Sequence, residues 1–152
     1  LGQFRSYDRK DENGSIHLDL FLFAKSIKLA ETEQEIKEYL KELSSSDNYV
    51  NNLIFIDGYL CKKINLRETP LGRQIADLFI AVNRSCGKSD YIPCIAWEEV
   101  ALQSTKLDGG SHVKIYGRIQ SRYYYKKLPQ NPNDGEWKIT YELSIIRIKP
   151  IK

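Results

Sequence analysis

The stretch that decides the fold is residues 113–126, which reads VKIYGRIQSRYYYK. Successive side chains of a β-strand point to opposite faces of the sheet. Small and apolar residues take the odd positions: Val113, Ile115, Gly117, Ile119 and Ser121. Cations and aromatic rings dominate the even positions: Lys114, Tyr116, Arg118, Gln120, Arg122, Tyr124 and Lys126. This alternation predicts a strand over residues 113–125 with one face packed on a core and the other presenting a cationic and aromatic ladder.

Further strand-like segments and one helical segment surround this strand. The pattern predicts strands at 53–63, 75–83, 91–97 and 137–148, a helix at 98–107, turns at 68–72 and 86–89, and a loop at 129–135. Three strands, a helix and two strands within about 100 residues are the element order of an all-β, five-stranded OB-fold barrel with one short helix. A small β-sandwich is the alternative architecture.

The N-terminal part of the chain predicts a β-hairpin and a helical linker. Alternating apolar residues at 15–23 follow turn residues at 11–14, so residues 2–29 are interpreted as one hairpin. Thr32 and Glu35 have the spacing of a capping box at the start of an amphipathic helix over 32–43. A linker follows, centred on 44–48. We therefore expect three parts: a hairpin at 1–29, a helix and linker at 30–50, and an OB domain at 51–150.

The N-terminal hairpin also repeats part of the predicted barrel. Residues 2–6 (GQFRS) parallel residues 117–121 (GRIQS), and aligning Gly14 with Gly135 places Leu18 on Ile139 and Leu22 on Leu143. Internal similarity of this kind indicates a repeated structural unit. We interpret the hairpin as the last two strands of a second, partial OB-like unit; chance similarity between two hairpins is the alternative.

Composition and motifs exclude several classes of protein. Hydrophobic residues make up 41% and charged residues 28% of the 152 residues, as in ordinary globular domains. The chain contains neither the run of about 20 apolar residues that a membrane helix needs nor a signal-peptide pattern. The absence of Met and the start at Leu1 suggest a processed or truncated product. Three cysteines without a CxxC pair predict reduced thiols in the cytoplasm, and two distant histidines argue against a zinc site.

A polyanion partner is indicated by the charge distribution. The net charge of +3 combines 7 Lys and Arg against 10 Asp and Glu at 1–49 with 16 against 10 at 50–152. The ladder of residues 114–126 suits single-stranded nucleic acid, because cations follow phosphates and aromatic rings stack on unpaired bases. The alternative is an amphipathic edge strand in a protein–protein contact, where Tyr and Arg are also enriched. Catalytic motifs and paired carboxylates are missing, so we expect neither an enzyme nor a cofactor.

The segment at 91–97 extends this interpretation. Tyr91 and Trp97 lie on one face of the predicted strand, while Ile92, Cys94 and Ala96 lie on the opposite, core-like face. Trp97 taken alone fits a core position. Together with the ladder, it predicts a continuous concave binding surface.

Residues 53–148 resemble the bacterial single-stranded DNA-binding proteins. The motifs that carry the resemblance are RETPLG at 67–72, AVNR at 81–84 and GRIQSR at 117–122. The resemblance implies an OB-fold, base-stacking aromatics at Tyr91, Trp97 and Tyr124, and phosphate contacts near Arg67, Arg84, Arg118 and Arg122. Cys86 stands where the family often has an aromatic residue, and 149–152 (KPIK) differ from the family's acidic tail. The N-terminal hairpin is additional, so the chain resembles a tandem-OB variant truncated within its first OB unit.

We therefore expect a cytoplasmic, nucleoid-associated protein that binds single-stranded DNA in replication, repair or recombination. The alternative is a primosomal-type OB subunit that acts mainly through contacts with replication proteins. The apolar N-terminal hairpin needs a partner surface, which leads us to expect a homo-oligomer. The predicted binding residues are Arg67, Arg84, Tyr91, Trp97, Lys114, Tyr116, Arg118, Arg122, Tyr124 and Lys126.

Overall fold

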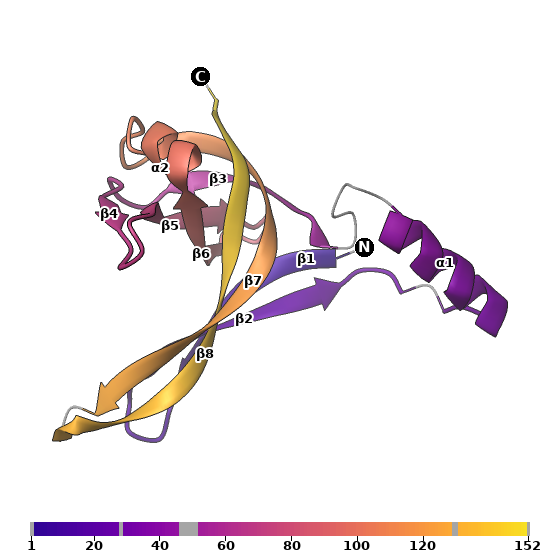
Figure 1. The fold of residues 1–152 in the computed structure, drawn as a ribbon, viewed down its shortest axis with the longest axis horizontal. Helices are drawn as coiled ribbons and strands as arrows, with labels where there is room; N and C mark the ends of the chain where they lie inside the picture. Colours follow the sequence, from indigo (N-terminus) through magenta and orange to yellow (C-terminus); the bar gives the residue numbers. More distant parts are fainter. Residues whose placement is uncertain (1, 28, 46–51, 129–130, 152) are drawn as a thin grey trace.

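Five strands of the chain close into a barrel, and a separate hairpin lies against it (Figure 1). The computed structural model describes residues 2–27, 29–45, 52–128 and 131–151. Its elements are β1 (Gly2–Lys10), β2 (Ile16–Ala24), α1 (Glu33–Ser45), β3 (Ile54–Leu60), β4 (Leu66–Glu68), β5 (Gln74–Asn83), β6 (Ser89–Trp97), α2 (Glu98–Ser104), β7 (His112–Leu128) and β8 (Asn131–Pro150).

The strand order confirms the predicted OB barrel. The sheet runs β3-β7-β8-β6-β5-β4, and an additional β3–β5 pairing closes the ring of five strands. All pairings are antiparallel except β6 with β8, which are parallel at Cys94↔Leu143 and Ile95↔Ser144. The short strand β4 lies outside the ring and pairs with the start of β5 around the predicted turn, where Gly72 adopts a left-handed φ of 78°.

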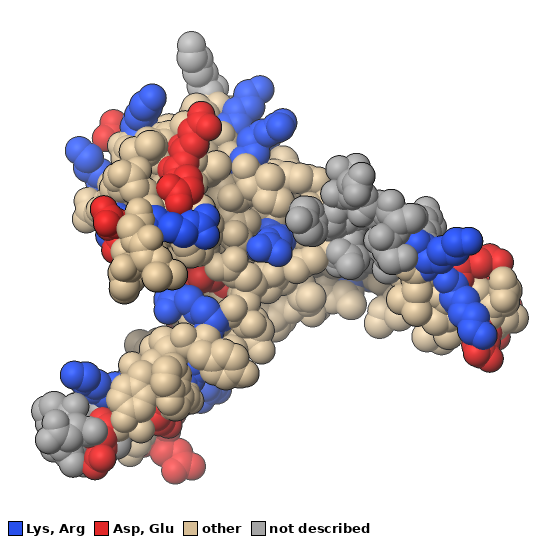
Figure 2. All heavy atoms as spheres, in the orientation of Figure 1, with Lys and Arg blue, Asp and Glu red and all other residues tan. Residues whose placement is uncertain are grey.

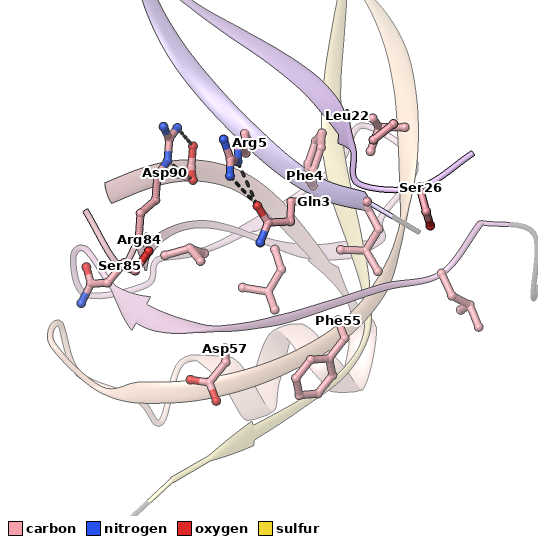
Figure 3. Close-up of a pocket in the computed structure, with 17 residues that line it drawn as sticks. Gln3, Phe4, Arg5, Leu22, Ser26, Phe55, Asp57, Arg84, Ser85 and Asp90 are labelled. Carbon is pink, nitrogen blue, oxygen red and sulfur yellow. Dashed lines mark hydrogen bonds and ion pairs between the residues drawn. The ribbon is translucent and has the colours of Figure 1, made fainter. Parts of the chain in front are cut away.

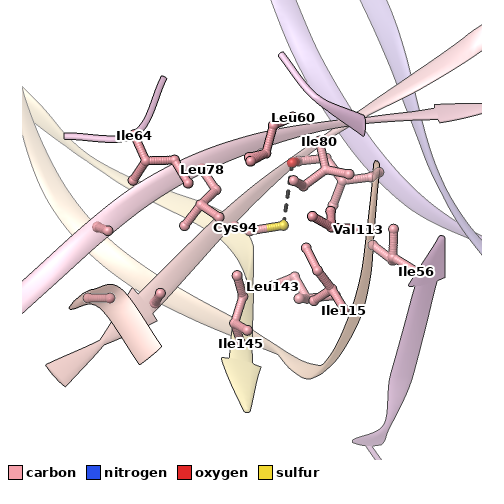
Figure 4. Packing of buried hydrophobic residues seen from close by; sticks show 14 residues of the cluster. Ile56, Leu60, Ile64, Leu78, Ile80, Cys94, Val113, Ile115, Leu143 and Ile145 are labelled. Atoms are coloured by element: carbon pink, nitrogen blue, oxygen red, sulfur yellow. Dashed lines mark hydrogen bonds between the residues drawn. The ribbon is translucent and has the colours of Figure 1, made fainter. Parts of the chain in front are cut away.

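The barrel interior is filled by the apolar side chains of alternating strand positions (Figure 4). The largest fully buried side chains of this core include Leu60, Ile80, Ile92, Ile115, Leu143 and Val113. Cys94 lies among them, and burial raises the pKa of its thiol. Each fully buried Leu or Ile side chain contributes about 1.5–3 kcal/mol relative to an exposed one, so this interior is the main source of stability.

The two long hairpins of the molecule share one pairing register. Phe4 faces Leu22 across β1 and β2, and Ile119 faces Leu143 across β7 and β8, as the sequence repeat predicts. The first glycine of each repeat also has the same surroundings. A Cβ at Gly2 would lie 2.8 Å from the carbonyl oxygen of Phe23, and a Cβ at Gly117 would clash with the equivalent oxygen of Ser144. The close approach of two backbones therefore explains both glycines.

The N-terminal hairpin docks on the barrel of its own chain. Phe4 and Leu20 pack against the core. The backbone N–H of Ser6 donates to Asp90 Oδ1 at 2.8 Å, and the backbone N–H of Tyr91 donates to Ser6 Oγ at 2.6 Å. Arg84 donates to Asp90 (Figure 3). It also donates to the carbonyl oxygen of Ser6 at 3.1 Å. We call Ser6, Arg84 and Asp90 the hairpin clamp.

This docking changes the expectation that the hairpin finds its partner in a second copy of the chain. One face of the hairpin is covered by its own barrel, so its apolar residues do not all need another molecule. Several apolar side chains of β2 nevertheless stay exposed, among them Ile16, Leu22 and Phe23. A cleft of about 970 Å³ also remains between the hairpin and the start of β3. The homo-oligomer stays a prediction.

Helix α1 stands away from the barrel, and its first turn confirms the predicted capping box. The backbone N–H of Glu35 donates to Thr32 Oγ1 at 3.2 Å, and the backbone N–H of Thr32 donates to Glu35 Oε2 at 3.4 Å. Its apolar side chains Ile36, Tyr39 and Leu40 are exposed. Most of the linker predicted at 44–48 lies outside the described residues.

The loop predicted at 129–135 is wrong for residues 131–135, which belong to β8. Residues 129–130 lie outside the described part of the chain. The register shifts between Lys127, which faces Gly135, and Leu128, which faces Asn131, so residues 132–134 have no partner in β7. Prolines and asparagines are tolerated at such a bulge and at the free edges of a two-stranded ribbon. The β7–β8 hairpin therefore projects far beyond the barrel (Figure 1).

The hairpin clamp should contribute strongly to stability. The Asp90 side chain is almost fully buried, so Asp90→Asn leaves Arg84 without its counter-charge, and we expect a loss of about 3 kcal/mol in the free energy of unfolding. Asp77→Asn breaks the half-exposed ion pair with Arg67 and should cost less than about 1 kcal/mol. Urea unfolding of both variants measures the difference, and equal losses would contradict the clamp.

The same clamp predicts a pH dependence. Burial opposes ionisation of Asp90, but hydrogen bonds from Arg84 and from the Ser6 backbone hold the pKa of its carboxyl below the usual range. Because the pKa is lowered on folding, this contact stabilises the protein above the unfolded value of about 3.9 and is lost as the pH falls through the folded value. The stability difference between the parent and Asp90→Asn should therefore begin to shrink below about pH 4 and vanish only below the folded pKa of Asp90, which pH-dependent urea unfolding measures.

Candidate nucleic-acid interface

One outer face of the barrel sheet carries most of the residues that the sequence singled out. Strand pairing aligns Asp77 of β5, Ile95 of β6, Ser144 of β8 and Arg118 of β7 in one row across the sheet. Because side chains alternate along each strand, Tyr91 and Trp97 of β6 lie on the same face as Arg118, Arg122 and Tyr124 of β7. The structure thus brings together two predicted surfaces that are far apart in sequence.

A groove of about 370 Å³ opens on this face. One side of it is lined by Asp77 and Phe79 of β5 and Pro93 of β6. Its other side is lined by Arg122 of β7 and by Thr140 and Glu142 of β8. The groove is therefore lined by both an aromatic ring, Phe79 of β5, and a cation, Arg122 of β7. These two strands do not pair with each other, because β6 and β8 lie between them.

Two aromatic residues form a platform beside the groove. The rings of Phe79 and Tyr91 are stacked, with centroids 5.9 Å apart and planes at 16°. Tyr91 is 41% exposed. The sequence analysis missed Phe79, although the parity of the 75–83 strand carries the signal: Phe79 shares its face with the exposed Asp77, whereas Leu78 and Ile80 are buried.

Trp97 lies at the far end of β6, directly before α2, and its ring is covered by a cation. The guanidinium carbon of Arg73 is 4.7 Å from the ring centroid, and Arg73 Nε donates to Glu98 Oε1 at 2.9 Å. Glu98 has a left-handed φ of 48°, which is uncommon for a residue other than glycine. The sequence predicted Trp97 as an open stacking site, but a base reaches this face of the ring only if Arg73 moves or stacks with it.

The cations of this face are held by carboxylates of the same chain. Arg67 donates to both carboxylate oxygens of Asp77, at 2.5 and 2.9 Å, and this hydrogen bond raises the pKa of Arg67 above its usual value. Glu142 is buried; it accepts from Arg122 at 3.3 Å and from Gln120 at 3.0 Å. The Arg122 guanidinium also lies 5.8 Å from the centroid of the Tyr124 ring. An anion that approaches the groove therefore competes with these internal carboxylates.

Arg84 has a different environment from the one its predicted role requires. Its side chain is 24% exposed and holds Asp90 and the carbonyl of Ser6 in the hairpin clamp. Arg84, which follows the end of β5, thus holds the hairpin on the barrel instead of facing a phosphate site. We do not include Arg84 in the interface.

Lys114 and Tyr116 lie beside β3, away from the groove. Tyr116 faces Phe55 and Lys114 faces Asp57 in the β3–β7 pairing, and Lys114 Nζ is 3.9 Å from Asp57 Oδ2. The ladder is therefore divided. Lys114 and Tyr116 belong to the β3 side of the barrel, Arg118 to Arg122 adjoin the groove side, and Tyr124 and Lys126 lie on the projecting part of the β7–β8 hairpin.

The alternation of burial along β7 ends where the strand leaves the barrel. Pairing with β3 stops at Gly117, and the side-chain amide of Asn52 then bonds the backbone N–H and C=O of Ile119, both at 2.9 Å. Ser121, predicted on the core face, is exposed because no third strand covers the hairpin there. We call residues 120–142, as far as the structure describes them, the arm.

The arm face opposite Arg122 and Tyr124 is mainly aromatic, with Lys127 near its tip. Its aromatic and apolar residues are Tyr123, Tyr125, Trp137, Ile139 and Tyr141, all exposed. The rings of Tyr125 and Trp137 meet edge to face, with centroids 5.4 Å apart. Figure 2 shows that Lys and Arg side chains are spread over the barrel and mixed with Asp and Glu, instead of forming one basic stripe on the face in view.

Among the described residues, no group of three or more His, Cys, Asp or Glu side chains is arranged to hold a metal ion. Within the same part of the chain, no helix is long and apolar enough to cross a membrane.

Comparison with known proteins identifies the family. Residues 51–146 match the Single-strand binding protein family. The chain belongs to this family. The resemblance inferred from the motifs at 67–72, 81–84 and 117–122 is therefore confirmed. The matched residues contain β3 to β7 and β8 as far as Ile146, whereas the last residues of β8 and the β1–β2 hairpin lie outside them.

Individual relatives agree with this assignment. Single-stranded DNA-binding protein 2 of Listeria innocua is 35% identical over 80 residues, covering 48% of this chain and 50% of the relative. Single-stranded DNA-binding protein B of Bacillus subtilis is 37% identical over 81 residues, covering 48% of this chain and 71% of the relative. The chain thus spans about half the length of the Listeria relative. It matches part of each protein.

A solved structure shows the same fold over nearly the whole chain. The crystal structure of a deletion mutant of the single-stranded DNA binding protein from Thermus aquaticus matches with a TM-score of 0.69 at 16% identity. The match covers 99% of this chain and 58% of that chain. The shared architecture therefore includes the N-terminal hairpin as well as the barrel.

The two tryptophans should report the two environments separately. Trp137 on the arm is 70% exposed, whereas Trp97 is half-buried beneath Arg73. Each single-tryptophan variant reports one site: Trp97→Phe retains Trp137, and Trp137→Phe retains Trp97. Acrylamide should therefore quench the tryptophan fluorescence of Trp97→Phe more strongly than that of Trp137→Phe. The reverse order of the quenching constants would contradict the placement of the arm.

Proposed function

We propose that this chain binds single-stranded DNA, without catalysis or a cofactor, on the outer face formed by β5, β6, β7 and β8. The observation that carries the proposal is the stacked pair Phe79 and Tyr91 beside a groove whose opposite side holds Arg122. Aromatic rings stack on bases of any sequence, and cations follow the phosphates. Family membership and the names of the Listeria and Bacillus relatives support the same ligand.

The geometry suggests a path across the sheet. Neighbouring strands lie about 4.8 Å apart, so the row from β4 to β7 spans about 19 Å. Along it the DNA meets Arg67, the Phe79 and Tyr91 platform, Arg122, and then Tyr124 on the arm. Trp97 adds a second stacking position at the α2 end of β6, with Arg73 as its cation. Arg118 and Lys126 are the further phosphate contacts that we retain from the sequence prediction.

The cellular role belongs to the same proposal. We infer that the chain acts in replication, repair or recombination as a cytoplasmic, nucleoid-associated protein, with replication proteins and further copies of itself as partners. Family membership supports this inference.

A primosomal-type OB subunit that acts mainly through protein contacts is the second candidate. The observation that favours it is the exposed face of the arm formed by Tyr123, Tyr125, Trp137, Ile139 and Tyr141, in which rings outnumber the cation Lys127. Exposed apolar patches of this kind are typical of interaction sites.

Removal of one ring from the platform should weaken DNA binding. Tyr91→Ala should reduce affinity for oligo-dT by about 1–3 kcal/mol, because a stacked base loses its partner. Tyr59→Ala is the matched control: Tyr59 has the same 41% exposure but stacks on His112, and its β3 position lies away from the groove. Fluorescence anisotropy of labelled oligo-dT measures both affinities. Unchanged binding by Tyr91→Ala would contradict the proposed surface.

The ion pair between Arg122 and Glu142 predicts that removing a negative charge from the groove strengthens DNA binding. Each phosphate contact to single-stranded DNA adds about 0.7 to the slope of log affinity against log salt. Glu142→Gln removes the carboxylate that holds Arg122, so affinity should rise severalfold at low salt and the gain should shrink as salt screens the groove. Glu99→Gln on α2 makes the same charge change away from the groove and should have little effect. Equal gains for both variants would indicate only a change in net charge.

A further inference from the structure

We propose that the outward face of the β1–β2 hairpin is a second contact surface for single-stranded DNA, continuous with the groove of the barrel. This proposal rests on the proposed function. The surface, which we call the hairpin ladder, consists of Arg5, Tyr7, Arg9, Phe21 and Phe23.

The docking of the hairpin decides which of its faces is open. Phe4 and Ser6 of β1 face the barrel, where Phe4 packs against the core and Ser6 is buried in the clamp. The odd residues of β1 therefore point away from the barrel. In the β1–β2 register Arg5 faces Phe21 and Gln3 faces Phe23, so the two phenylalanines belong to the same outward face. The rings of Tyr7, Phe21 and Phe23 are all exposed.

Cations and rings alternate on this face, as on the ladder of β7. The Arg5 guanidinium carbon lies 4.3 Å from the centroid of the Phe23 ring, and Arg5 also donates to Gln3 Oε1. Arg9 pairs with Asp19 at 2.6 Å. A base that stacks on an exposed ring of this face therefore has a guanidinium within reach of its phosphate.

The shared register places the hairpin ladder at the positions that form the proposed interface in the barrel. Under the repeat alignment Tyr7 corresponds to Arg122, and Arg9 corresponds to Tyr124. On the second strand, Phe21 stands where the barrel has Glu142, so a ring replaces the carboxylate that holds Arg122. Asp19 stands where the barrel has Thr140, and this carboxylate holds Arg9 instead. Asp90, whose charge also acts on Arg5, is already neutralised by Arg84.

The hairpin clamp connects the two surfaces. Ser6 Oγ accepts from the backbone N–H of Tyr91, whose ring forms the platform beside the groove. Arg5 and Tyr7 are the residues on either side of Ser6, so DNA that passes the Tyr91 end of the groove reaches them next. Figure 3 shows Arg5 and Gln3 close to the Arg84–Asp90 pair, and in Figure 1 the hairpin continues past the barrel toward its turn.

The test uses two lengths of oligo-dT on the full chain. An oligonucleotide of about 8 nucleotides fits on one OB surface, whereas one of about 20 nucleotides exceeds it. Tyr7→Ala should weaken binding of the long oligonucleotide by about tenfold, within the range of one lost stacking contact, and leave the short one unchanged. Tyr39→Ala on α1 is the matched control, because Tyr39 is also 61% exposed, and it should change neither affinity.

Each outcome is decisive. Binding of the long oligonucleotide by Tyr7→Ala at parental affinity would overturn the hairpin ladder while the proposed function of the barrel stands. A change in oligomeric state by light scattering without a change in DNA affinity would overturn it in favour of a protein contact. Failure of the parent to bind either oligonucleotide would overturn the proposed function and this inference together. Because Tyr7 lies outside the clamp, an unchanged urea midpoint checks that the variant is folded.

Discussion

The antiparallel pairing of β7 with β8 is the constraint on which the rest of this structure depends. The other edge of β7 pairs with β3, and the other edge of β8 pairs in parallel with β6, so this hairpin joins β3 to β6 and the β3–β5 pairing then completes the ring. Gly117 allows the two backbones to approach where a side chain would clash with the carbonyl of Ser144. The same pairing turns the even residues of β7 outward and then carries them beyond the barrel on the arm. The closed barrel, the outward binding face of β7 and the projecting arm therefore all follow from the β7–β8 register.

Electrostatics in this chain serves docking as much as ligand binding. Arg84, Arg67 and Arg122 each hold a carboxylate of the chain itself: Asp90, Asp77 and Glu142 respectively. Burial separates their roles. The Asp90 carboxylate is enclosed, so its pair with Arg84 acts as a structural contact between the hairpin and the barrel. The half-exposed pair of Arg67 and Asp77 contributes little to stability and leaves the guanidinium close to solvent, where an incoming phosphate can compete for it.

The repeated hairpin explains a part of the chain that the family match does not cover. Residues 51–146 account for most of the barrel, whereas β1 and β2 lie outside the match and reproduce the register of β7 and β8. The hairpin packs on the barrel next to it. There the side chains of Asp90 and Arg84 bond the backbone N–H and C=O of Ser6, as a neighbouring strand would do within a sheet. Docking on the barrel therefore stabilises the hairpin, since an isolated two-stranded hairpin is marginal in water.

The sequence alone determined the barrel, the capping box of α1 and the register shared by the two hairpins, because period-2 alternation, local capping and a repeated glycine act between residues that are neighbours in the chain or across one turn. It also placed Tyr91, Arg118 and Arg122 on outward faces. It did not reveal that Arg84 belongs to a clamp, that Phe79 supports Tyr91, or that Ser121 and Tyr123 lie on a ribbon open on both faces. Those outcomes depend on which strands meet when the barrel closes. Contacts between β1, β5 and β6 join residues more than 70 positions apart, and only the tertiary structure decides whether a charged side chain at such a point meets solvent or an opposite charge.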